Sequence, residues 1–180
     1  MAKKAKKRKP GRKVLPLSRT DLLPLSEAQA RDVSLRTHLT LVAVRAGHGN
    51  LTMLGELLKT VFIAYFVCKT DGRIPFFEDF VEAARGLEAG MDSGEAQGLW
   101  DIEDESASAI EVILALHDRQ LAVEASYRIE RAKEQLRVIL DKGAFPDLAH
   151  AYAMENHSSA TSQHVTHATA GEATQAMRPS

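Results

Sequence analysis

The 180-residue sequence contains a single cysteine, six prolines and eleven glycines. A disulfide framework needs paired cysteines, and collagen-like or proline-rich chains need far more glycine and proline, so both classes are excluded. A lone thiol is typical of a protein from a reducing compartment, and we expect a cytoplasmic location.

Long hydrophobic runs are also missing. The longest apolar stretch, Val61 to Cys68, has eight residues, whereas a membrane-spanning helix needs about 20. No apolar segment of signal-peptide length follows the basic first residues, so we expect neither secretion nor a membrane partner. Hydrophobic residues make up 44% of the chain and charged residues 26%, which is typical of one globular domain.

The formal net charge of −1 conceals a strong separation of charge along the chain. Residues 71–111 contain twelve acidic side chains against two arginines, whereas residues 1–13 contain eight basic side chains and no acidic one. Like charges at this density repel one another, so we expect residues 1–25 to form a disordered basic arm followed by an extended lead-in. The eight basic residues are Lys3, Lys4, Lys6, Lys7, Arg8, Lys9, Arg12 and Lys13.

Such an arm attracts nucleic acid by releasing counterions from the phosphates, without reading the base sequence. We therefore predict that these eight side chains contact nucleic-acid phosphates non-specifically. The alternative interpretation is a terminus that only raises solubility.

From Ser26 onward the apolar residues follow helical rather than alternating spacing, which predicts an all-α fold. We expect a single bundle of four to five helices over residues 26–142, followed by a flexible His/Ser/Thr/Ala tail over residues 143–180. Ser26 and Gln29 have the spacing of a capping box at the start of the first helix, which ends at Gly47. Its apolar positions include Leu35, Leu39 and Val42.

A second helix is predicted over residues 51–69, with Asn50 as its N-cap. This segment is apolar nearly all round, which is typical of a helix in the middle of a bundle. The helix-turn-helix interpretation fails here, because a recognition helix must present polar and basic side chains to the major groove.

The third helix is expected to begin at Pro75 and to place Phe77, Phe80 and Leu87 on one face. Four glycines then interrupt the pattern, which predicts a connecting loop over residues 89–99 with Trp100 packed at its end. These glycines are Gly86, Gly90, Gly94 and Gly98.

Residues 101–142 are helical by spacing and allow two interpretations. We favour two helices with a corner at residues 122–125 and Ser126 as the cap of the last one; the alternative is one unbroken helix. Acidic residues crowd the first turn at 101–105, where the helix dipole favours negative charge without any catalytic role.

No recognised motif places a nucleophile or a metal site in the sequence, so we predict that the protein is not an enzyme and needs no cofactor or metal. His117 lies on an apolar helical face beside Asp118 and is interpreted as a core-edge histidine, and Cys68 as a small hydrophobic residue. Four late histidines fit a flexible tail better than a metal site, because metal sites need preorganised ligands. They are His150, His157, His164 and His167.

Three segments, residues 51–87, 116–121 and 126–140, together resemble small helical proteins of proteobacteria and their mobile elements. Some of those proteins are labelled Fis-family transcriptional regulators. The resemblance implies a regulator, although this chain does not end in the helix-turn-helix of Fis, so no DNA-contacting residue is carried over.

Together these features predict a non-enzymatic accessory or regulatory protein that touches nucleic acid through its arm, while the acidic bundle binds a protein partner or a second copy. The alternative hypothesis is a helical protein-interaction adaptor with no nucleic-acid role.

Overall fold

The computed structural model describes residues 17–142 and Leu148, and within these residues it consists of helices and turns without a β-strand. The predicted all-α bundle is confirmed. In chain order the elements are α1 (Glu27–Ala43), the π-helical turn η1 (Val44–His48), α2 (Leu51–Thr70), α3 (Phe77–Gln97), α4 (Asp104–Val123) and α5 (Ser126–Leu140). The predictions for residues 1–16 and for most of the tail lie outside the described residues.

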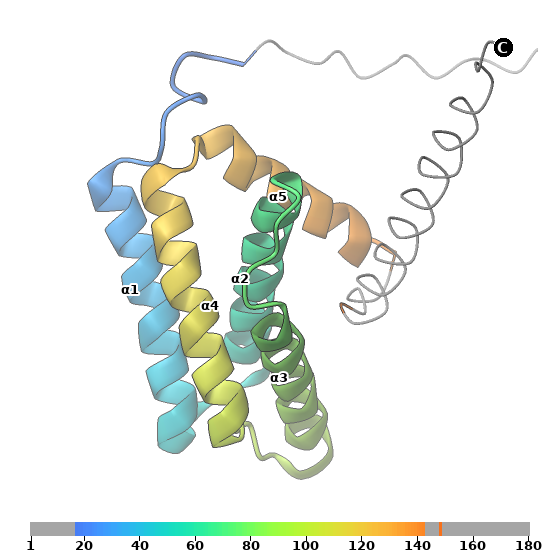
Figure 1. The fold of residues 1–180 in the computed structure, drawn as a ribbon. Coiled ribbons are helices and arrows are strands. Elements are labelled where there is room, and N and C mark those ends of the chain that lie inside the picture. Colours follow the sequence, from blue (N-terminus) through green and yellow to red (C-terminus); the bar gives the residue numbers. More distant parts are fainter. Residues whose placement is uncertain (1–16, 143–147, 149–180) are drawn as a thin grey trace, which may run out of the picture.

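The helices are arranged around α2, which contacts each of the other four α-helices. Figure 1 shows α1 and α4 side by side, α3 beside α2, and α5 lying across one end of the bundle. Helices α2, α3 and α4 all pack against one another, whereas α1 lies at the edge of the bundle and packs against α2 and α4.

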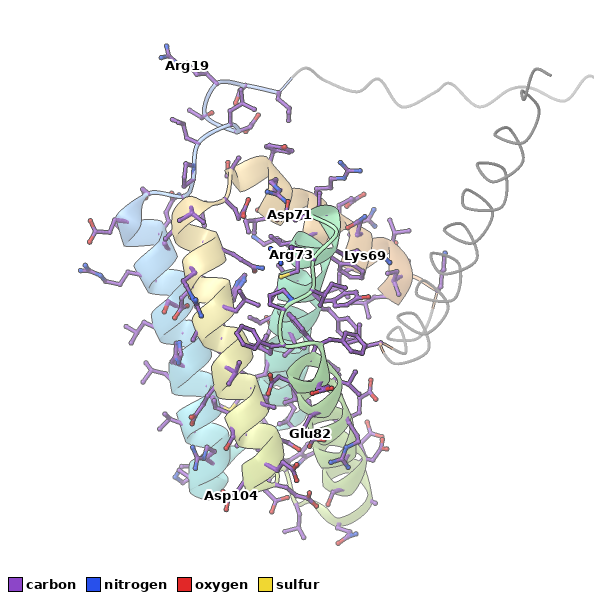
Figure 2. All side chains as sticks on the ribbon, in the orientation of Figure 1. Arg19, Lys69, Asp71, Arg73, Glu82 and Asp104 are labelled. Atoms are coloured by element: carbon purple, nitrogen blue, oxygen red, sulfur yellow. The ribbon has the colours of Figure 1, made fainter. Side chains whose placement is uncertain are left out.

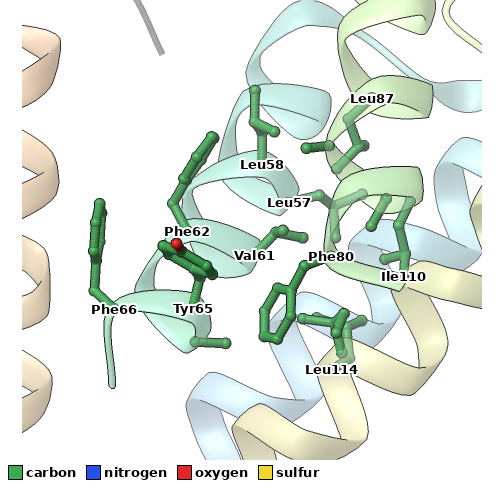
Figure 3. Close-up of a cluster of buried hydrophobic side chains, with 14 of the residues drawn as sticks. Leu57, Leu58, Val61, Phe62, Tyr65, Phe66, Phe80, Leu87, Ile110 and Leu114 are labelled. Atoms are coloured by element: carbon green, nitrogen blue, oxygen red, sulfur yellow. The ribbon is translucent and has the colours of Figure 1, made fainter. Parts of the chain in front are cut away.

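The apolar character of α2 is explained by this central position. Eleven of its side chains are buried, and all of them except Thr60 form a cluster with residues of α3 and α4, including Phe80, Leu87 and Ile110 (Figure 3). By length and composition α2 is the one described helix that could cross a membrane. A core helix of a bundle has the same composition, because it is surrounded by other helices rather than by lipid.

The helix-boundary signals in the first third of the chain are confirmed. The Ser26 hydroxyl accepts from the amide of Gln29, whose side chain bonds back to the Ser26 amide, completing the capping box. Asn50 Oδ1 accepts from the amide of Met53 at 3.0 Å. Gly47 ends the first helical segment with φ +79°, a left-handed conformation that glycine adopts without steric strain.

The predicted loop over residues 89–99 is wrong, because α3 continues through Gln97 and ends at Gly98 with φ +76°. Its glycines allow close packing instead of breaking the helix. A Cβ atom at Gly86 would lie 2.2 Å from Ser106 Cβ, and one at Gly94 would lie 2.1 Å from the ring of Trp100. Trp100 packs against the core at the end of α3, as predicted.

Residues 101–142 form two helices, so the unbroken-helix alternative is wrong. The chain leaves α4 at Glu124 and enters α5 after Ala125. Ser126 is not the cap that was predicted. It is the first residue of α5, and its hydroxyl donates to the carbonyl of Asp21 at 3.2 Å.

Two further segments differ from the predicted course of the chain. Residues 18–23 form turns rather than an extended lead-in, and Leu23 O accepts from the amide of Ser126 at 2.8 Å, which attaches this segment to the α4–α5 corner. Pro75 lies before α3 rather than in its first turn, because Phe76 adopts a left-handed conformation with φ +56° and α3 begins at Phe77.

Candidate functional site

The eight basic residues predicted to contact nucleic acid, Lys3 to Lys13, and the four tail histidines lie outside the described residues. The described chain begins near Arg19, at the opposite end of the bundle from Asp104 (Figure 2). The bundle therefore receives the arm at one end and carries part of its acidic surface at the other.

The described bundle is acidic, with 21 acidic and 14 basic side chains in residues 17–142. Part of the excess lies on α3 and at the start of α4, as the charge count predicted. There Glu82 accepts from the Ser106 hydroxyl at 2.6 Å and from Arg85, and these hydrogen bonds, that of Ser106 most of all, lower the pKa of Glu82. This carboxylate is held ionised by its neighbours, and no group of His, Cys, Asp and Glu suited to a metal ion occurs within residues 17–142.

A shallow hollow of about 220 Å³ lies beside these residues, between α3 and the segment that leads into α4. Gly86 and Gly90 form one side of it, and Asp101, Glu103 and Ser106 the other. A Cβ at Gly86 or Gly90 would meet Ser106 or the Asp101 carbonyl, so these glycines bring α3 close to the segment before α4. Arg85 lines the hollow together with Asp101 and Glu103, so it carries charges of both signs.

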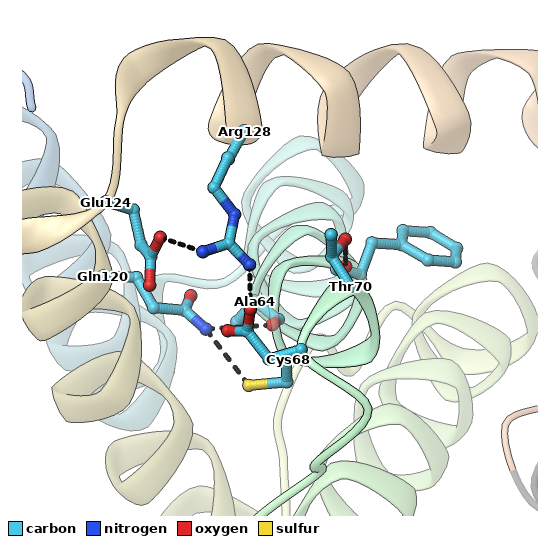
Figure 4. A network of polar contacts seen from close by, with 8 residues as sticks. Ala64, Cys68, Thr70, Gln120, Glu124 and Arg128 are labelled. Carbon is cyan, nitrogen blue, oxygen red and sulfur yellow. Dashed lines mark hydrogen bonds and ion pairs between the residues drawn. The ribbon is translucent and has the colours of Figure 1, made fainter. Parts of the chain in front are cut away.

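A buried polar network joins α2 to α4 (Figure 4). The amide nitrogen of Gln120 donates to Ala64 O at 3.1 Å and to Cys68 Sγ at 3.2 Å. The Gln120 oxygen is thereby oriented toward His117 Nδ1, 3.4 Å away, so His117 must carry its hydrogen on Nδ1 to donate this bond.

These contacts give His117 and Cys68 structural roles. Burial lowers the pKa of His117, opposed by its hydrogen bond with Gln120. Burial, with Asp71 nearby, raises the pKa of the Cys68 thiol to about 11, so the thiol is protonated and weakly nucleophilic at neutral pH. Asp118 faces away from His117, and its Oδ2 lies 2.9 Å from His38 Nε2 in a hydrogen bond. The two residues are 80 positions apart, so this pairing was not predicted from the sequence.

The turn after α2 is connected to α5 through Arg128. Its guanidinium pairs with Asp71 after α2 and with Glu124 at the α4–α5 corner, and Figure 4 shows the arginine between these elements. Burial lowers the pKa of Arg128, but the carboxylate partners outweigh it and raise this pKa overall, so the group stays cationic. These ion pairs link the first turn of α5 to the turn after α2 and to the α4–α5 corner.

We predict that the buried His117 makes stability fall in mild acid. The unfolded chain takes up a proton on this histidine near pH 6.5, whereas the folded state has a lowered pKa and keeps the ring neutral. Below about pH 6.5 the unfolded state therefore binds more protons, and the free energy of unfolding should fall by up to about 1.4 kcal/mol per pH unit.

Urea unfolding between about pH 7.5 and about pH 5.5 measures this slope. His117→Gln should flatten it, while His48→Gln, which replaces an exposed histidine, should leave it unchanged. A slope that is the same in both variants would show that His117 is not the group responsible.

An apolar surface remains on α1. Leu35, Leu39 and Val42 are 56%, 57% and 62% exposed, although the sequence analysis grouped them with the apolar positions of a bundle helix. Leu41 and Val44 instead supply the buried contacts near the end of this helix. Single-sequence spacing could not distinguish the two faces, because both are apolar.

Comparison with known proteins does not assign the chain to a family. No family model, no curated protein and no solved structure matches this chain.

Proposed function

We propose that this protein is a non-enzymatic accessory or regulatory protein, with a role connected to transcription, that contacts nucleic acid non-specifically through its basic N-terminal arm. The observation that carries the proposal is the separation of charge: eight cations without an acid in residues 1–13, and an excess of acids in residues 17–142. The resemblance to proteins labelled as transcriptional regulators supports the connection to transcription.

Because the bundle is acidic, the basic arm is the part of the chain that is suited to contact phosphates. Polyanions are repelled by a body of like charge and attracted by a dense cationic segment, and each phosphate contact releases counterions. Binding of this kind depends strongly on salt and only weakly on base sequence.

Deleting residues 2–13 tests the proposal. We expect the slope of log K against log salt for a short DNA duplex to become shallower by about 5 to 7, since eight cations are removed and each contact contributes about 0.9. Fluorescence anisotropy over a salt series, with two duplexes of different base composition, measures the slope and its independence of sequence.

The control variant is Lys133→Gln, which removes one exposed cation of α5 and should change the slope by at most about one. An affinity that is the same with and without residues 2–13 would refute the arm as the nucleic-acid contact.

A protein-interaction adaptor is the second candidate function. The specific observation in its favour is the exposed apolar stripe of α1, because large apolar side chains clustered on one helix face are typical of interaction sites. The two functions are compatible, since one uses the arm and the other the bundle.

A further inference from the structure

A groove of about 460 Å³ lies between α2 and α5. Figure 3 shows Phe66 between these two helices, on the opposite side of α2 from Phe80. Val138 of α5 is 44% exposed, so the groove has an apolar wall that the described helices leave open. The residues that line this α2/α5 groove are Phe66, Arg131, Glu134, Gln135, Val138 and Ile139.

The groove lies next to the point where the chain leaves α5. Val138 and Ile139 belong to the last turn of this helix, which ends at Leu140. Leu148, eight residues later, is only 4% exposed and belongs to the same apolar cluster as Phe66. Eight residues span at most about 27 Å. The chain therefore returns to the hydrophobic core soon after α5, and the residues that follow Leu148 start from the bundle itself.

The sequence after this buried leucine supplies apolar side chains at once and then stops supplying them. Residues 149–154 contain Tyr152, Met154 and three alanines, and the next large apolar residue is Val165. Tyr152 follows Leu148 by four residues, the spacing that places two side chains on one face of a helix. The apolar groups that could fill a groove thus lie within six residues of a side chain that is already buried.

We propose that residues 149–154 of this chain occupy the α2/α5 groove, with Tyr152 against Phe66 and Val138. A tyrosine suits this site, because its ring is apolar and its hydroxyl can hydrogen-bond to the polar side chains that also line the groove. The segment ties the end of α5 to α2, as Arg128 ties the beginning of α5 to the turn after α2. The inference is independent of the basic arm and of the adaptor hypothesis.

The size of the groove argues against a second copy or another protein as its occupant. Six described residues line it, whereas a stable protein–protein interface uses about 20 to 30 residues on each side. A segment of the same chain does not need so large an area, because its attachment at Leu148 gives it an effective concentration of about a millimolar or more. A few apolar contacts are then enough to keep it in place.

A double-mutant cycle in the full chain tests the contact. Val138→Ala and Tyr152→Ala are made singly and together, and urea unfolding gives the equilibrium constant of each variant. We expect the double variant to differ from the product of the two single effects by at least about threefold, because both substitutions remove the same contact. Val112→Ala is the matched control. This valine of α4 is 37% exposed and does not line the groove, so its effect and that of Tyr152→Ala should multiply.

Cross-linking then locates the segment. The native Cys68 is buried, and the pKa of its thiol is raised to about 11, so it competes little with introduced cysteines. Val138→Cys combined with Tyr152→Cys should form a disulfide within one chain, at a rate that does not depend on protein concentration. The control pair, Val112→Cys with Tyr152→Cys, should cross-link at least about tenfold more slowly, because a disulfide requires the two Cα atoms to lie within about 7 Å. Mobility in a gel without reductant measures both rates.

Three results would overturn the proposal: independent effects of Val138→Ala and Tyr152→Ala, equal rates of cross-linking for the two cysteine pairs, or cross-links that form only between chains. The last would assign the groove to a second copy. None of these substitutions removes a cation, so the salt dependence of DNA binding by the arm should stay unchanged. Failure of this inference and failure of the arm proposal can therefore be told apart.

Discussion

Replacing Phe80 with alanine is expected to lower the free energy of unfolding by about 3 to 5 kcal/mol. Phe80 is fully buried and its ring meets that of Tyr65 edge-on, with centroids 5.7 Å apart. It lies in the cluster where α2, α3 and α4 meet (Figure 3), so truncation removes apolar contacts and leaves a cavity between three helices. Urea unfolding followed by far-ultraviolet circular dichroism measures the loss.

Phe76 is the matched control for this substitution. It lies one helical turn before Phe80, but its side chain is 50% exposed. Phe76→Ala should therefore cost less than about 1 kcal/mol. Similar losses in the two variants would contradict the placement of Phe80 in the core.

Replacing Gly86 with alanine is expected to lower the free energy of unfolding by about 2 kcal/mol, although alanine is the better helix former. The added Cβ would lie 2.2 Å from Ser106 Cβ and 2.1 Å from its hydroxyl. Because that side chain is buried on α4, α3 and α4 must move apart to admit the methyl group. The cost of this overpacking exceeds the gain in helix propensity of about 1 kcal/mol.

Gly55 provides the opposite case. It lies inside α2, and a Cβ there would meet nothing within 4 Å. Gly55→Ala should raise the free energy of unfolding by up to about 1 kcal/mol through helix propensity alone. Urea unfolding of both variants, with Ser106→Gly added to Gly86→Ala to relieve the clash, tests the argument. Stabilisation by Gly86→Ala would show that the two helices are not in close contact at this point.

The sequence predicted the features that depend on neighbouring residues. The capping box at Ser26, the cap at Asn50 and the stop at Gly47 are interactions within a few residues, and each is confirmed. The central position of α2 also followed from composition, because a helix without a polar face needs burial on every side. The corner between α4 and α5 followed from the need to bury two apolar stripes.

The errors arose where tertiary contacts decide the outcome. The glycines of α3 were interpreted as helix breakers, but Gly86 and Gly94 face Ser106 and Trp100, whose proximity spacing alone does not reveal. Ser126 was interpreted as a cap because its residue type is common at caps, whereas its hydroxyl bonds a carbonyl more than 100 residues earlier.

The same distinction holds for the two candidate functional features, the basic arm and the exposed surface of α1. A run of cations can be read directly from the sequence, so the arm needed no fold to be noticed. The exposed apolar stripe of α1 could not be predicted, because Leu39 and Leu41 look alike in sequence and only packing leaves one exposed and the other buried. His38 and Arg119 gain their positions from the antiparallel pairing of α1 with α4.

The hydrogen bonds that hold residues 18–23 against the α4–α5 corner set a limit on distance. Lys3 and Lys13 lie fifteen and five residues before Ser18, so fully stretched backbone can carry them at most about 50 Å and about 17 Å from this anchor. A nucleic acid held by them would therefore be tethered to one pole of the bundle.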